Sequence, residues 1–174
     1  MLTCDRIEAK KEEEAAQSMK RILFLLIMSF VVSATAIAEG GNTQMLEIPT
    51  GVAGSLDADI DIGDIVISTD ALQHDMDATV LGFARGEIPY SNQSVFPADE
   101  EMRKSAVQAV KEAAPDIHVF EGRVCSGDQF IASREQKEFL ISEFGGLCCE
   151  MEGAAIAQVC YLNGTPFYHH PRYL

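Results

Sequence analysis

The sequence has few basic residues, and they form no stripe after Arg21. It contains 13 lysines and arginines against 27 aspartates and glutamates, which gives a formal net charge of −14 at pH 7. Proteins that bind nucleic acid use clustered Lys and Arg to neutralise phosphates and release counterions. The composition therefore argues against a nucleic-acid partner, and the acidic surface indicates only that the chain repels polyanions.

The sequence also lacks the spacing of cysteines and glycines that marks several common sites. Its cysteines are odd in number and fit neither a Cys-x-x-Cys metal knuckle nor a small disulfide scaffold; they are Cys4, Cys125, Cys148, Cys149 and Cys160. We interpret all five as reduced thiols that pack mostly as small apolar residues, which favours a reducing compartment. Without a Walker A loop or a G-x-G-x-x-G turn, the sequence argues against nucleoside triphosphate and dinucleotide sites.

The first 41 residues differ from the rest of the chain. Lys20 and Arg21 precede an apolar run, and Ala34–Ala38 carries an Ala-x-Ala pattern. If translation began at Met19, segment 19–38 would resemble a secretory signal peptide, whereas the alternative is a buried helix or strand of a soluble core. We expect a cytoplasmic protein, with export as the alternative and any membrane contact confined to this stretch. Residues 42–174 are expected to form one partial domain.

Beyond Pro49, strand-like runs alternate with helical patterns. The β-branched run 64–69 is typical of a strand buried on both faces, and 119–125 is a second strand candidate. Helices are predicted at 99–114, where the apolar stripe is Met102, Ala106, Val107, Val110 and Ala113, at 133–144 and at 152–162. Ser133 and Gln136 form a capping box, and Gly145-Gly146 is expected to end that helix. The alternation predicts an α/β fold with a mostly parallel or mixed sheet covered on both faces.

Glu150-Met151-Glu152 is the most unusual segment, because two acids flank a methionine where an apolar strand meets a helix. If the strand direction persists, both carboxylates point the same way and can accept hydrogen bonds from ligand hydroxyls near the helix N-terminus. The alternative is that the acids only cap the helix. The residues alone leave both interpretations open.

Two histidine-containing segments invite a metal interpretation that the pattern does not support. His74, Asp75 and Asp77 lie on one local loop, and His169-His170 are adjacent, so that their side chains diverge in an extended chain. Neither set has the ligand geometry that a metal site needs. We expect no metal and no cofactor.

Five motifs, in this order, resemble the 5′-methylthioadenosine/S-adenosylhomocysteine nucleosidases of the nucleoside phosphorylase superfamily. They are Thr50–Asp57, Ile62–Ser68, Gln73–Asp77, Ser126–Ile131 and Glu150–Val159, and the resemblance runs from about Thr50 to Phe167. Glu-Met-Glu followed by Ala or Gly is shared across the superfamily. Ser-Gly-Asp-x-Phe-Ile together with His-Asp-x-Asp points to the nucleosidase branch.

The resemblance implies a three-layer nucleoside phosphorylase-like fold, incomplete here, in which helices flank a mixed central sheet. It also implies hydrolysis of the N-glycosidic bond of 5′-methylthioadenosine and S-adenosylhomocysteine, which releases adenine in methionine salvage. In the family, residues matching Glu152 and Met151 bind the ribose, and those matching Phe130 and Ile131 hold the adenine. Val52 and Gly54 match the turn beside the ribose and the attacking water.

The resemblance further implies a homodimer. Leu81 and Pro89 match positions that reach into the alkylthio pocket of the neighbouring subunit. Ala78 stands where the family usually has another apolar residue of that wall, and its smaller volume is expected to loosen the wall.

The sequence departs from the family at both ends. The Gly-Ala-Met-x-Glu-Glu turn that supplies the general base has only a faint echo at Ala9–Glu14, which is too weak for the base to be assigned there. After Thr165-Pro166-Phe167, residues 168–174 replace the run toward Arg-Ala-Ile-Ser-Asp, whose Asp is the general acid. We therefore expect a chain truncated at both ends with weak or no turnover. The alternatives are a non-catalytic adenosine-binding remnant and a purine nucleoside phosphorylase.

Overall fold

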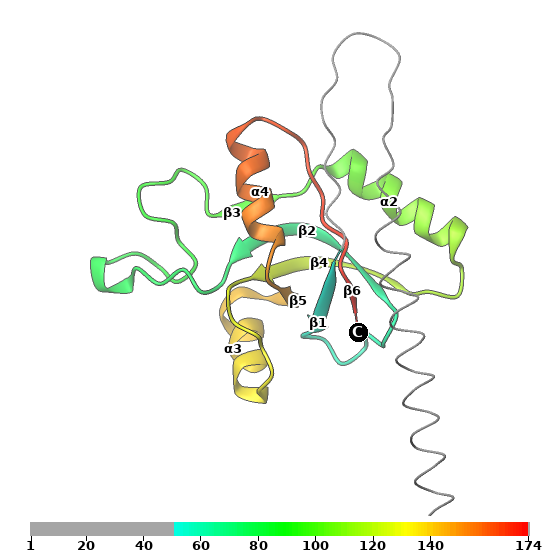
Figure 1. The fold of residues 1–174 in the computed structure, drawn as a ribbon, viewed down its shortest axis with the longest axis horizontal. Helices are drawn as coiled ribbons and strands as arrows, with labels where there is room; N and C mark the ends of the chain where they lie inside the picture. Colours follow the sequence, from blue (N-terminus) through cyan, green and yellow to red (C-terminus); the bar gives the residue numbers. More distant parts are fainter. Residues whose placement is uncertain (1–50, 174) are drawn as a thin grey trace, which may run out of the picture. The chain divides into compact units, whose positions relative to one another are not determined.

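The computed structural model describes residues 51–173, which fold into a mixed six-stranded sheet with helices on both sides (Figure 1). The strands are β1 Val52–Ser55, β2 Ile65–Gln73, β3 Val95–Pro97, β4 Val119–Ser126, β5 Gly146–Glu150 and β6 Arg172–Tyr173. The helices are the short 3-10 helix η1 Thr79–Leu81 and the α-helices α2 Glu100–Ala113, α3 Arg134–Phe144 and α4 Gly153–Leu162. This confirms the predicted three-layer α/β fold with a mixed sheet. The signal-like segment 19–38 lies outside the described residues.

The strand order is β3-β2-β4-β5-β1-β6, and β6 also pairs with β2. The sheet therefore curls until five of its strands form a closed ring. Strands β2, β4 and β5 are parallel, with Gln73 opposite Ser126 and Ser126 opposite Glu150. Strand β1 runs antiparallel to β5, so it begins where β5 ends. The ends of three strands and the start of a fourth thus meet at one edge of the sheet.

Adjacent residues on the central strands point to opposite faces and pack into two separate cores. Val124 and Cys148 pack with Ala154 and Ala157 of α4. Their sequence neighbours Cys125 and Cys149 pack instead with α3, against a set that includes Leu72, Leu140 and Phe144. Figure 1 shows α4 and α2 on one side of the sheet and α3 on the other. The prediction of strands buried on both faces is confirmed.

Local signals place most helix ends correctly. The side chain of Asp99 accepts a hydrogen bond from the Met102 amide at 2.9 Å, and the Ser133–Gln136 capping box is present. Gly145 ends α3 in the left-handed region at φ 66°, whereas Gly146 already belongs to β5, so assigning both glycines to the helix end was wrong. Strand β2 continues to Gln73, four residues past the predicted run, because its second half pairs with both β3 and β4.

Four cysteines lie in the described residues, and all four are buried; Cys4 lies outside that range. Burial raises the pKa of Cys125 to about 12 and raises the pKa of Cys148 well above its usual value. These thiols pack as small apolar residues, as predicted. No helix within residues 51–173 has the length and apolar character needed to cross a bilayer.

The raised thiol pKa values predict slow alkylation of the folded protein. Because the thiolate is the reacting form, Cys125 and Cys148 should resist iodoacetamide at pH 8 and react readily once the chain is unfolded in urea. Mass spectrometry of the separate cysteine peptides measures both rates. Equal rates in the folded and unfolded protein would contradict the burial of these thiols.

Candidate functional site

Three predicted site segments leave the sheet at the same edge. The loop Gly127–Ile131 follows β4, and Met151-Glu152 follow β5. Because Gly54 of β1 lies opposite Cys149 in an antiparallel pair, Val52 falls beside the residues that leave β5. Sheet pairing therefore sets Gly54 opposite Cys149 and brings Val52 to the end of β5, which Met151-Glu152 follow, while the Phe130–Ile131 loop follows the adjoining strand β4.

The loop after β4 is held in place by hydrogen bonds to the end of β5 and to the residues that follow β2. The amide of Gly127 donates to the carbonyl of Glu150 at 3.2 Å, and the amide of Asp128 donates to Oδ2 of Asp75 at 2.7 Å. A Cβ on Gly127 would lie 2.5 Å from Nε2 of His74, so a glycine is required for this close approach. From this fixed loop Phe130 projects with 82% of its surface exposed.

Glu150 is buried and caps helix α4. One of its carboxylate oxygens accepts hydrogen bonds from the amides of Glu152 at 2.9 Å and Gly153 at 2.7 Å, and the other accepts the hydroxyl of Ser126. Nε2 of His169 lies 3.3 Å from the carboxylate. Burial alone would raise the pKa of Glu150, but the hydrogen bonds and charge from His169, with those of Ser126 and the Glu152 amide, outweigh it and lower the pKa.

The two acids of the motif therefore have different environments. The strand direction on which a shared orientation of Glu150 and Glu152 depended does not persist, because β5 ends at Glu150 and its carboxylate turns back to accept amides of the first helical turn. Capping, the alternative interpretation, is confirmed for Glu150. Glu152 is exposed and makes no side-chain capping bond, and Met151 beside it is 43% exposed.

This arrangement suits a ligand that has both hydroxyl and apolar parts. The carboxylate of Glu152 lies at the N-terminus of α4, where the helix dipole favours negative charge. It can accept hydrogen bonds from ligand hydroxyls, while Met151 and Phe130 offer exposed apolar and aromatic surface.

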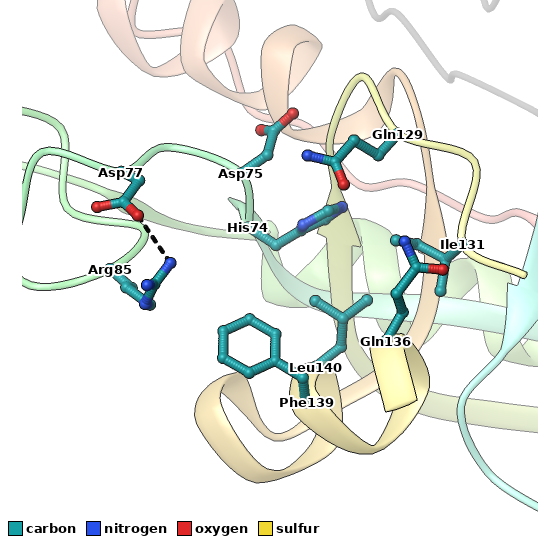
Figure 2. A pocket seen from close by; sticks show the side chains of 9 residues that line it. All are labelled: His74, Asp75, Asp77, Arg85, Gln129, Ile131, Gln136, Phe139 and Leu140. Atoms are coloured by element: carbon teal, nitrogen blue, oxygen red, sulfur yellow. Dashed lines mark hydrogen bonds and ion pairs between the residues drawn. The ribbon is translucent and has the colours of Figure 1, made fainter. Parts of the chain in front are cut away.

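A separate pocket of about 250 Å³ lies between the end of β2 and helix α3 (Figure 2). Its lining comprises His74, Asp75, Asp77, Arg85, Gln129, Ile131, Gln136, Phe139 and Leu140. Among the predicted binding residues, Ile131 alone lines it. Arg85 and Asp77 form an ion pair of 2.8 Å at its edge, which Figure 2 shows.

The two histidine segments lie in different surroundings. His74 is buried, and burial lowers its pKa despite the opposing charges of Asp75 and Glu150. His169 turns inward to Glu150, whereas His170 stacks on Tyr168 at 5.5 Å, so the adjacent histidines diverge as expected. Among the described residues, no three His, Cys, Asp or Glu side chains are grouped to hold a metal ion.

The residues assigned to a neighbouring subunit lie on the connection between β2 and β3. Leu81 is 68% exposed, Pro89 is half-buried, and Ala78 is 8% exposed and packs within its own chain. The homodimer stays a prediction.

Sequence reasoning missed Ser126 and His169. The Ser126 hydroxyl bonds Glu150 and also accepts the amide of Ala154 at 2.7 Å, which ties β4 to the start of α4. A local signal existed for Ser126, because it stands at the end of a strand next to a glycine. None existed for His169, which meets Glu150 only because its segment lies beside β2 and under α4.

Two curated proteins similar to the chain are named 5′-methylthioadenosine/S-adenosylhomocysteine nucleosidase. The protein from Glaesserella parasuis is 38% identical over 121 residues, which cover 69% of this chain and 51% of the relative. The protein from Chromohalobacter salexigens is 38% identical over 135 residues, which cover 73% and 57%. The chain thus spans about half the length of the curated relatives that it matches.

Solved structures agree with this similarity. A Helicobacter pylori nucleosidase mutant with 5′-methylthioadenosine in its active site is 37% identical, with a TM-score of 0.68 over 72% of this chain and 53% of the other. A structure named futalosine hydrolase, also from Helicobacter pylori, is 37% identical, with a TM-score of 0.67 over 72% and 55%. A family model described as the phosphorylase superfamily matches residues 28–168, most of the sequence. The chain therefore belongs to the phosphorylase superfamily.

Proposed function

We propose that this chain carries the ribose- and adenine-binding half of a nucleosidase site. The whole protein would hydrolyse the N-glycosidic bond of an adenosine thioether such as 5′-methylthioadenosine or S-adenosylhomocysteine. One observation carries the proposal: sheet pairing groups Val52 and Gly54, the Phe130–Ile131 loop and Met151-Glu152 at one edge. The similarity to nucleosidases supports the choice of substrate.

Each side chain of the group suits one part of such a substrate. Glu152 would accept hydrogen bonds from the ribose hydroxyls, and its negative charge would stabilise the positive charge that develops on the sugar. Met151 would pack under the sugar. Phe130 would stack on the adenine ring, while the backbone of Ile131, held in a fixed loop, would bond its edge.

The reaction adds water to the anomeric carbon as the bond to adenine breaks. The bonding electron pair leaves with adenine, which takes up a proton, and the ribosyl thioether keeps the new hydroxyl. A base that activates water and an acid that protonates adenine each contribute about 10²- to 10⁴-fold in such reactions. We assign neither role to a described residue, so nucleoside binding is the part of the proposal that residues 51–173 support directly.

Three alternatives share the same site. A binding remnant would hold adenosine-like ligands without cleaving them, and a phosphorylase would need inorganic phosphate. Futalosine is the third candidate ligand, because a similar solved structure is named futalosine hydrolase. An assay of base release with and without phosphate distinguishes all three.

A homodimer and a cytoplasmic location complete the proposal. The connection from β2 to β3 exposes three large apolar side chains, Val80 at 94%, Leu81 at 68% and Tyr90 at 92%, which supports a partner surface there. The buried thiols of Cys125, Cys148 and Cys149, which form no disulfide, are compatible with a reducing compartment. Export remains the alternative if Met19 begins a signal peptide.

An assay of adenine release tests the proposed reaction. We expect the full chain to bind an unreactive 5′-thioether analogue of adenosine in calorimetry, with cleavage of 5′-methylthioadenosine that is weak and independent of phosphate. Release of the free base from futalosine is measured in parallel, and cleavage of futalosine in preference to 5′-methylthioadenosine would favour the third alternative. Binding without release would favour the remnant, a requirement for phosphate would favour the phosphorylase, and the absence of any nucleoside binding would overturn the proposal.

Replacing Glu152 by Gln tests the assignment of the ribose site. The change removes the charged acceptor, so nucleoside affinity should fall about tenfold or more while adenine affinity stays within about twofold, since hydrogen bonds to charged groups contribute about 1.5–3 kcal/mol. Glu143→Gln, at an exposed carboxylate on α3, is the matched control. Equal losses for nucleoside and adenine would remove Glu152 from the ribose site.

A further inference from the structure

His169 occupies an unusual position for an ionisable side chain. Its side chain is 2% exposed, as is the side chain of Glu150 that it faces at 3.3 Å. It belongs to the segment after Phe167 in which the sequence departs from the motifs of the nucleosidases. The carboxylate that it faces accepts the amides of Glu152 and Gly153.

The sheet fixes the backbone of His169. Its amide donates to the hydroxyl of Ser68 at 2.8 Å, and its carbonyl accepts the amide of Ser68 at 2.8 Å. Ser68 lies in the middle of β2 and is fully buried. The imidazole therefore projects from a rigid segment and has a defined place under the first turn of α4.

The imidazole of His169 packs against Gly153 so closely that a side chain at position 153 would collide with it. A Cβ on Gly153 would lie 2.8 Å from Cδ2 and 3.1 Å from Nε2 of His169, and 3.2 Å from Oε1 of Glu150. The backbone at Gly153 is not in the left-handed region, so space rather than φ accounts for the glycine. The histidine and the glycine are therefore a complementary pair.

The carboxylate of Glu150 connects the imidazole of His169 to the turn that carries Met151 and Glu152. A buried carboxylate needs hydrogen-bonding and charge partners, and His169 is the basic side chain within ion-pair distance of it. The oxygen nearest His169 is the one that receives the amides of Glu152 and Gly153. Holding that oxygen in place holds the turn from which Met151 and Glu152 project.

We propose that His169 is a positioning residue, which acts through Glu150 and the space left by Gly153 to fix Met151 and Glu152 for ribose binding. This role rests on the proposed function of the site. His169 touches no substrate, so its loss should affect recognition of the sugar more than recognition of the base.

Paired affinity measurements separate this role from a general effect on folding. In His169→Leu, affinity for the unreactive adenosine thioether should fall about tenfold to a hundredfold, while affinity for free adenine stays within about twofold, as expected when a buried carboxylate loses its basic partner. His169→Gln keeps a donor for Glu150 and should recover part of the loss. His118→Leu, at an exposed histidine, is the control.

A double-mutant cycle tests the complementary pair. Gly153→Ala should weaken thioether binding by itself, because the added methyl group displaces the imidazole. Combined with His169→Ala, which removes the obstructing ring, its additional effect should be much smaller than in the unaltered protein. Additive losses would overturn the coupling between the two residues.

Amide hydrogen exchange of the free protein keeps the two proposals distinguishable. The amides of Glu152 and Gly153 should exchange faster in His169→Leu than in the unaltered chain, while the amides of β2 and β4 keep their protection. Unchanged exchange of those two amides would overturn the positioning role whether or not a nucleoside binds. Failure of the unaltered chain to bind any nucleoside would instead overturn the proposed function.

Discussion

The buried carboxylate of Glu150 joins the end of the sheet to the beginning of α4, and the site depends on this junction. It accepts the hydroxyl of Ser126 from β4 and two amides of the α4 turn, and it faces His169 from the segment beside β2. Buried polar networks of this kind are stable when every donor has an acceptor. Removal of one member leaves the others buried without partners, so the network holds its parts in one arrangement.

This junction also separates the two acids by role. Glu150 satisfies the helix terminus internally, and Glu152 is thereby left exposed for a ligand. A helix that opens with a single acid would have to use it either as a cap or as a binding group. The Glu-Met-Glu sequence provides a cap in Glu150 and a binding group in Glu152, with the exposed Met151 between them.

The sequence predicted the fold well where the signals were local. Ser133 and Gln136 indicated a capping box, and the β-branched run before Thr69 indicated a strand buried on both faces, because both signals are read from neighbouring residues. It failed after Glu150, where the strand ends and strand alternation no longer applies to Glu152. No signal in the sequence indicated the role of His169, since its contact with Glu150 depends on how distant segments pack. The residues of the candidate site were recognised through their resemblance to a family.

The free energy of unfolding of two variants tests this division of roles most directly. In urea titrations, Glu150→Ala should cost at least about 2 kcal/mol, because the amide and hydroxyl donors that it accepts would be buried without partners. Glu152→Ala should stay within about 0.5 kcal/mol, as is usual for exposed residues outside such networks. Equal costs for the two variants would contradict the account, since the two acids would then share one structural role.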